Sequence, residues 1–195
     1  KRICDLDCDK IKEYVWDEKL YGNILCEGAQ GFWLDIDYGN YPYVTSSSTL
    51  PYSACSLGFS PKLIRNIYGT IKIYDTRAGF DPLFPDSLLE DTELNLIGDI
   101  GEEYGTTTGR RRKVNWLNLD KLIEAINISG TNKLIISKVD ILEKINVFKY
   151  FYKNTLLCID SFDTMKESIK QLLFSECLEL KEITFSNNKE TIDMV

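Results

Sequence analysis

The segment from Gly105 to Lys113 carries the densest set of chemically active side chains in the sequence. It reads Gly-Thr-Thr-Thr-Gly-Arg-Arg-Arg-Lys, so two glycines, three hydroxyls and three guanidinium groups follow one another. Glycines free the backbone to present N–H groups to an anion, and arginines bind carboxylate or phosphate through paired, charge-assisted hydrogen bonds. The alternatives are a solvated basic turn, a localisation signal or a nucleic-acid patch. Because the chain is acidic overall, we favour a site for an anionic small molecule.

A second motif, Ser137-Lys138-Val139-Asp140, follows the apolar run 134–136. The Asp140 carboxylate can accept from the N1–H and the exocyclic amine of guanine together, while the Lys138 stem lies over the ring. Adenine presents the wrong pattern of donors and would leave these bonds unmade. The alternative is an ordinary charged turn after a strand.

Two further polar segments could contact a nucleotide. Gln30 lies between Gly28 and Gly31, and its amide can donate and accept at the edge of a purine ring. The segment 43–49 is rich in hydroxyl groups that suit a phosphate. A strand-end turn and a generic polar loop remain the alternatives for these two segments.

The chain contains no histidine among its 195 residues. It therefore supplies no Ser-His-Asp triad, no Cys-His pair and no His-ligated zinc. The acids and bases that remain are those of Asp, Glu, Lys, Tyr and Cys.

Charge and cysteine content narrow the class of protein further. The formal net charge is −7, which argues against nucleic acid as a partner. No apolar run is long enough to span a membrane, and we expect neither a membrane partner nor a leading signal peptide. The six cysteines are irregularly spaced, so we expect reduced thiols, a cytoplasmic location and no metal site. Cys26 follows the apolar residues Ile24 and Leu25, and we expect it to be a buried free thiol.

The hydrophobic pattern predicts alternating helices and strands. Helices are expected over 3–20, 61–68, 88–98, 117–128 and 165–174, and strands over 23–26, 70–76, 134–137, 147–152 and 180–185. This order predicts the α/β class, with a mostly parallel central sheet flanked by helices and a small C-terminal α+β portion.

Taken together and in this order, the motifs resemble the adenylosuccinate synthetase family. The resemblance rests on Glu27–Gly31, Tyr41–Ser47, Thr76–Gly79, Gly105–Arg112 and Ser137–Asp140. It is strong over about residues 23–145 and matches the C-terminal half of the family. It implies a fold like that of P-loop NTPases without its N-terminal half. It also implies a single domain with a leading helix over 1–22, a core with substrate loops over 23–145 and a trimmed subdomain over 146–195.

The resemblance implies a ligase that joins IMP and L-aspartate with GTP and Mg²⁺. GTP first phosphorylates the 6-oxygen of IMP, and the aspartate amine then displaces the phosphate. The residues expected at IMP are Gln30, which supports the purine 6-oxygen, Thr45, Ala78 and Arg110. Those expected at L-aspartate are Thr106, Thr107, Thr108, Gly109, Arg110, Arg111 and Arg112. Those expected at GTP are Arg112, Lys138, Val139, Asp140, Ser186, Asn187 and Asn188.

The family's phosphate loop, catalytic aspartate and catalytic histidine have no counterpart in this sequence. The chain begins with Lys1, and we expect it to be a piece of a longer protein. We expect the Mg²⁺ ligands to lie in the half that this sequence lacks, and the full-length protein to form a homodimer. Alone, it is expected to be inactive. Two other functions stay open: a related ligase that acts on a guanylate to make a 2-aminoadenine precursor, and a non-catalytic nucleotide-binding module.

Overall fold

The structure is a computed structural model that describes residues 21–105 and 109–187. The predicted helix over 3–20 lies outside these residues. Seven strands and four α-helices are described, together with short 3-10 helices. The strands are β1 (Tyr68–Lys72), β2 (Tyr74–Arg77), β3 (Lys113–Asn118), β4 (Lys133–Ser137), β5 (Phe148–Tyr152), β6 (Thr155–Ile159) and β7 (Glu182–Ser186). The α-helices are α2 (Thr92–Ile100), α3 (Leu119–Ser129), α4 (Val139–Ile145) and α5 (Phe162–Glu176).

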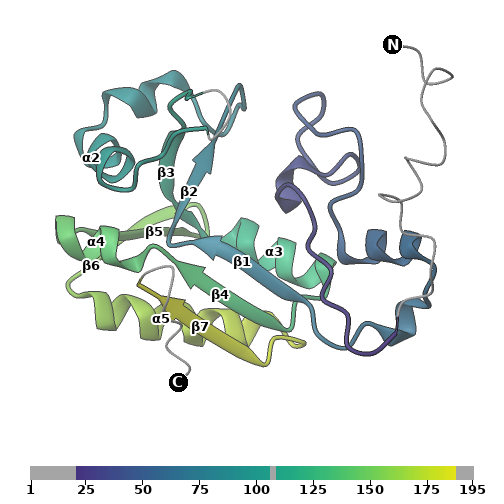
Figure 1. The fold of residues 1–195 in the computed structure, drawn as a ribbon. Coiled ribbons are helices and arrows are strands. Elements are labelled where there is room, and N and C mark those ends of the chain that lie inside the picture. Colours follow the sequence, from purple (N-terminus) through teal and green to yellow (C-terminus); the bar gives the residue numbers. More distant parts are fainter. Residues whose placement is uncertain (1–20, 106–108, 188–195) are drawn as a thin grey trace, which may run out of the picture.

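The α/β prediction is confirmed, but the strands form two sheets (Figure 1). The first sheet has the order β1-β4-β7 and is wholly parallel. The second has the order β2-β3-β5-β6, with one parallel pair between two antiparallel pairs. In the central β4, Leu134 and Ile136 lie on one face of the sheet and are almost fully buried, whereas Ile135 on the other face is half-buried.

The predicted single strand over 70–76 is wrong in one respect. β1 ends at Lys72 and β2 begins at Tyr74, so the chain leaves one sheet and enters the other at Ile73. The Ile73 side chain is fully buried, and its N–H still donates to Ser137 O across 3.0 Å. The alternation of apolar and charged residues is interrupted only by the consecutive buried residues Ile73 and Tyr74, and this short break does not by itself indicate a change of sheet.

The helices begin and end at residues that satisfy their free backbone groups. The Asn118 side chain accepts from the N–H of Lys121 at the start of α3, and Gly130 ends α3 in the left-handed conformation. Asp91 caps α2 and Ser161 caps α5 in the same way. The helices predicted over 88–98, 117–128 and 165–174 are thus confirmed, with boundaries moved by a few residues. Helix α4 and strands β3 and β6 were not predicted.

Two expectations for the first third of the chain are wrong. No strand forms over 23–26, and Cys26 is exposed rather than buried. The predicted helix over 61–68 is only one 3-10 turn, Pro61–Leu63, followed by extended chain. Residues 21–31 are exposed, and residues 21–66 lie to one side of the sheets and pair with none of the described strands (Figure 1), so a short apolar run is not enough to form a strand here.

The core lies between the sheets and helices. α2 packs against β3 and α4, while α3 and α5 pack against β5 and against each other. Tyr74, Tyr150 and Met165 are among the largest side chains that are fully buried. None of the helices in the described part of the chain combines the length and apolar character needed to cross a membrane.

Candidate functional site

A buried carboxylate, that of Glu103, gathers cations from three separate parts of the chain. Only 2% of Glu103 is exposed. Its Oε2 lies 2.6 Å from Lys72 Nζ and 3.4 Å from an Arg112 guanidinium nitrogen. Its Oε1 accepts from the Tyr74 hydroxyl at 2.8 Å and lies 3.2 Å from Lys138 Nζ. Two residues predicted to bind GTP, Arg112 and Lys138, therefore meet at one side chain.

These interactions shift the pKa values of the cluster. Burial alone would raise the pKa of Glu103, but the hydrogen bond and charge of Lys72, with help from Tyr74 and Lys138, hold it below its ordinary value. Burial lowers the pKa of Lys72, opposed by Glu103, and burial with the Glu103 bond raises the pKa of Tyr74. Glu103 is thus ionised and the Tyr74 hydroxyl is neutral at physiological pH.

The backbone closes the arginine-rich loop at its base. The Arg112 N–H donates to Glu103 O at 2.9 Å, and the Gly105 N–H donates to Arg110 O at 2.8 Å. Gly109 takes a positive φ of 62°, which glycine adopts without steric cost. The predicted aspartate contacts Thr106, Thr107 and Thr108 lie outside the described residues.

The consecutive arginines do not share one direction. Arg111 donates to Asn95 O and pairs with Asp99 at 2.8 Å, so it lies against α2. Arg112 turns to Glu103 instead. Successive side chains of an extended segment point to opposite faces, which separates these two guanidinium groups.

The motif at the end of β4 forms a strained turn into α4. Lys138 is in the left-handed conformation, with φ 60°, and its ammonium contacts both Glu103 and the carbonyl of Gly101. Val139 is buried, and Asp140 in the first turn of α4 pairs with Lys144 at 2.7 Å. Left-handed conformations of non-glycine residues cluster at functional sites.

The register of the parallel sheet places the predicted contact Ser186, and the residues that precede Lys138 and Ile73, in one row. Lys72, Ser137 and Ser186 are neighbours across β1, β4 and β7, each at the carboxyl end of its strand. Lys138 and Asn187 follow directly, while Asn188 lies outside the described residues. Ligands of open α/β sheets bind at this edge.

A second polar organiser, Asp35, shapes the hydroxyl-rich loop. Its fully buried carboxylate accepts from the backbone N–H groups of Asp37, Tyr38 and Thr49 and from the Ser48 hydroxyl. Burial would raise the pKa of Asp35, but these bonds, led by Thr49, hold it below its ordinary value.

The residues predicted at IMP are partly drawn together. Arg77 donates to Tyr43 O at 2.6 Å and pairs with Asp81, which ties the segment before Thr45 to the strand before Ala78. Thr45 is half-buried and Ala78 is exposed. Gln30 is exposed, with φ 72°, and borders a cavity of about 1730 Å³.

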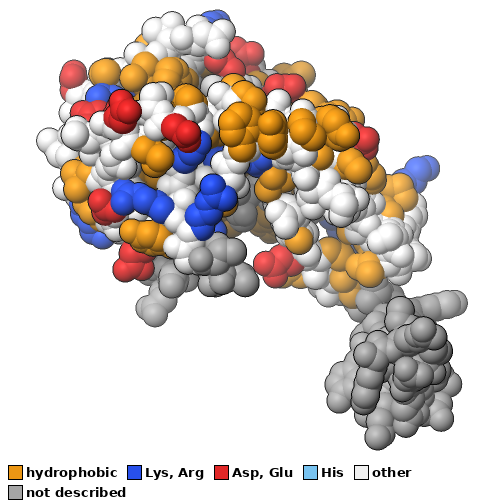
Figure 2. Space-filling model, turned by 90° about the horizontal axis from the view of Figure 1, so that it is seen from above, with side chains coloured by type: hydrophobic (Ala, Val, Ile, Leu, Met, Phe, Trp, Pro, Cys, Tyr) orange, Lys and Arg blue, Asp and Glu red, His pale blue; other side chains and the backbone are white. Residues whose placement is uncertain are grey.

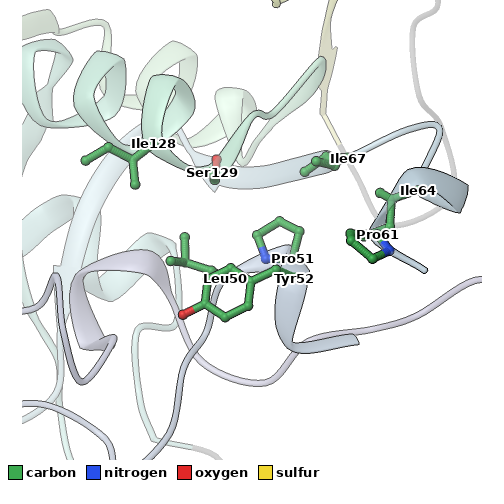
Figure 3. Close-up of a pocket in the computed structure, with 8 residues that line it drawn as sticks. All are labelled: Leu50, Pro51, Tyr52, Pro61, Ile64, Ile67, Ile128 and Ser129. Atoms are coloured by element: carbon green, nitrogen blue, oxygen red, sulfur yellow. The ribbon is translucent and has the colours of Figure 1, made fainter. Parts of the chain in front are cut away.

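This large cavity lies between the segment 22–34 and strands β1 and β2, where the molecule is hollowed (Figure 2). Its walls include Asp75, Arg77 and Lys121. A smaller cavity of about 210 Å³ separates the end of α3 from the segment 50–64 (Figure 3). Apart from Ser129 and the hydroxyl of Tyr52, its side chains are apolar, and no charged group faces a ligand there.

Metal ligands are not evident in the part of the chain that the structure covers. No group of three or more Cys, Asp or Glu side chains between 21 and 187, the loop 106–108 aside, is arranged to hold an ion. Cys26, Cys55, Cys158 and Cys177 are free thiols.

Lys72, Tyr74, Glu103 and Asp35 were not recognised as site residues from the sequence. Glu103 lies two residues before the Gly-Thr-Thr-Thr-Gly-Arg loop, and Lys72 is a charged residue between Ile71 and Ile73. These are the only signals the sequence offers, because burial of a charge depends on contacts between residues far apart in the chain.

Comparison with known proteins agrees with the sequence resemblance. The sequence model of the family described as adenylosuccinate synthetase matches residues 5–173. The adenylosuccinate synthetase of Phocaeicola vulgatus is 45% identical over 65% of this chain and 30% of its own length. That of Thermodesulfovibrio yellowstonii is 43% identical over 76% of this chain and 38% of its own length.

Solved structures show the same likeness. The fully ligated adenylosuccinate synthetase of Plasmodium falciparum has a TM-score of 0.68 and 25% identity, covering 87% of this chain and 49% of that one. The succinoaminodeoxyadenylate synthetase of cyanophage S-2L, bound to dGMP and dATP, has a TM-score of 0.57 and 17% identity. The match covers 86% of this chain and 45% of that one, and at this identity it shows a shared fold alone. The chain spans 30% to 49% of the length of these proteins. It belongs to the adenylosuccinate synthetase family.

Proposed function

We propose that this chain contributes the guanine-reading turn and the aspartate-binding loop of a GTP-dependent ligase that joins L-aspartate to IMP. The products are adenylosuccinate, GDP and phosphate. Homodimer formation, a cytoplasmic location and a requirement for Mg²⁺ belong to the same proposal, and all three follow from the family.

One observation carries the proposal. Lys138 directly follows β4, and Ser186 is the last residue of β7. These two strands are parallel neighbours, although the two residues lie almost fifty positions apart in the chain. Arg112 reaches the same place through Glu103. The turn assigned to the base and the arginine assigned to the phosphates therefore meet at one carboxylate, which supports a shared nucleotide site.

The chemistry of these side chains suits the substrates. The Asp140 carboxylate can accept from two N–H groups of guanine, and adenine cannot supply both. L-aspartate, a phosphorylated purine and a triphosphate concentrate negative charge, which guanidinium groups stabilise. Arg110 is assigned to aspartate and IMP, and Arg112 to aspartate and the phosphates of GTP.

Calorimetry of the purified chain with GDP and with ADP tests nucleotide recognition. We expect measurable binding of GDP, at least ten-fold weaker binding of ADP, and loss of GDP binding in Arg112→Met. Equal affinity for the two nucleotides, or no binding of GDP, contradicts the proposed guanine site.

A chimera tests the reaction itself. Residues 23–150 would replace the matching region of the Phocaeicola vulgatus relative, and product would be followed by chromatography with IMP, L-aspartate, Mg²⁺ and either GTP or ATP. We expect GTP-dependent formation of adenylosuccinate. An inactive but folded chimera, beside an active parent enzyme, would favour a non-catalytic nucleotide-binding module.

A further inference from the structure

We propose that Glu103 is a positioning residue whose carboxylate holds Arg112 and Lys138 at a fixed separation, one cation on each oxygen. In this way it joins the arginine-rich loop to the guanine-reading turn. The inference rests on the proposed function, because there Arg112 and Lys138 are assigned to GTP.

The two oxygens of Glu103 divide their partners evenly. Oε1 serves Tyr74 and Lys138, at 2.8 and 3.2 Å. Oε2 serves Lys72 and Arg112, at 2.6 and 3.4 Å. On each oxygen the shorter contact comes from a sheet residue and the longer one from a predicted nucleotide contact. Tyr74 and Lys72 thus anchor the carboxylate, and Lys138 and Arg112 are oriented by it.

The backbone around Glu103 fixes where the carboxylate lies. The Glu103 N–H donates to Gly98 O at 2.9 Å, and its carbonyl accepts from the Arg112 N–H. Tyr74 is almost fully buried in β2, and Lys72 ends β1. A rotation of the Glu103 side chain would break four contacts at once, so the carboxylate is a rigid link between loop and turn.

The charge of the cluster leaves room for an anion. One carboxylate faces the three cations Lys72, Arg112 and Lys138, so it balances only part of their positive charge. A glutamate at this point costs some of the attraction for phosphate. A role in orientation therefore predicts weaker phosphate binding when the carboxylate is removed, whereas simple electrostatics predicts stronger binding.

Two variants separate orientation from charge. Glu103→Gln removes the buried carboxylate, and Glu102→Gln removes an equal charge from the exposed neighbouring residue. By calorimetry of the full chain, we expect Glu103→Gln to bind GDP at least ten-fold more weakly and to lose preference for GDP over ADP. We expect Glu102→Gln to stay within two-fold of the unmodified chain. Equal effects of the two variants, or stronger binding by Glu103→Gln, would overturn the proposal.

A second variant keeps the test valid if Glu103→Gln does not fold. Tyr74→Phe removes one hydroxyl and no charge, and it frees the oxygen that faces Lys138. We expect a loss of GDP-over-ADP preference with little loss of overall phosphate binding, measured with inorganic pyrophosphate. A folded Tyr74→Phe chain with unchanged preference would count against Glu103 as the link.

A ligand-free measurement distinguishes failure of this inference from failure of the proposed function. Nitrogen-15 spectra report whether the Lys138 ammonium and Arg112 guanidinium are held or rotate freely, with Lys138→Met and Arg112→Met giving the assignments. We expect both signals to lose protection from exchange with water in Glu103→Gln. If the two signals do not change in Glu103→Gln, the positioning role is wrong. If they change but the unmodified chain does not bind GDP, only the assignment of this site to a nucleotide is wrong.

Discussion

The backbone N–H of Thr49 donates to Asp35 Oδ2 across 2.6 Å, and the Asp35 side chain is fully buried. Three further donors, from Asp37, Tyr38 and Ser48, meet the same carboxylate. Fifteen residues that lack regular secondary structure, from 35 to 49, are thereby closed into a loop that presents Thr45.

Replacing this carboxylate by an amide is expected to destabilise the loop. In Asp35→Asn one acceptor oxygen is replaced by an amide NH₂ group, which cannot accept from the N–H and O–H groups that surround it. We expect the free energy of unfolding to fall by about 1–3 kcal/mol. Because the pKa of Asp35 is lowered in the folded state, its stabilisation is present above the unfolded pKa of about 3.9 and disappears as pH falls through the folded value. Urea denaturation at pH 7 and pH 3 checks this, with the exposed Asp37→Asn as control. Equal stability of both variants at pH 7 would refute it.

Asp75 is expected to make the protein less stable as pH rises from 5 to 8. Burial raises its pKa to about 7, against smaller opposing effects of the Asn118 N–H and Lys121. The folded chain then holds a proton that the unfolded chain has released, so the free energy of unfolding falls between the unfolded pKa near 4 and pH 7. The chain has no histidine, so few other side chains titrate in this range.

Asp75→Asn is expected to flatten this dependence and to gain about 1–2 kcal/mol at pH 8, because the amide oxygen can still accept from the Asn118 N–H. Urea denaturation across the pH range measures the slope. The exposed Asp160→Asn is the control, and a slope that survives in Asp75→Asn would disprove the assignment.

Asp140 is expected to decide between guanine and adenine. Asp140→Asn replaces the acceptor of two N–H groups by one acceptor and one donor, which should lower GDP affinity by about ten- to a hundred-fold, equivalent to 1.5–3 kcal/mol for hydrogen bonds to a charged group. ADP affinity should hardly change. Calorimetry measures both, with Asp163→Asn, also in the first turn of a helix, as the matched control. A parallel loss for GDP and ADP would show that Asp140 acts only on folding.

Gly101 is expected to be intolerant of a side chain. An added Cβ would lie 2.5 Å from the Tyr74 hydroxyl and 2.8 Å from Ile97 O, so Gly101→Ala must displace the hydroxyl that binds Glu103. Such overpacking costs about 1–3 kcal/mol. Thermal denaturation measures the loss. Gly28→Ala, where nothing lies within 4 Å, is expected to be neutral, and a Gly101→Ala chain as stable as this control would contradict the prediction.

Local pattern predicted much of the fold from 88 onward. Helix α3 has its apolar stripe, its Asn118 cap and its terminal Gly130 within thirteen residues, and β4 is a short apolar run. These signals lie within one element and do not depend on the rest of the chain. The failures at 23–26, at Cys26 and over 61–68 lie in or next to residues 21–66, which have no sheet partner, so local apolar character does not decide burial there. The short elements β3, α4 and β6 were also missed, although they lie after residue 88.

The sequence by itself determined the chemical inventory: no histidine, an arginine-rich loop, a Lys-x-Asp turn and the α/β order of elements. The tertiary structure alone decided which of these groups meet. Arg111 pairs with Asp99 while Arg112 pairs with Glu103, and Glu103 finds Lys72 thirty-one residues away. The reason is physical, because periodicity and capping act within a few residues, whereas a buried ion pair is made by strands and turns that only the complete fold brings together.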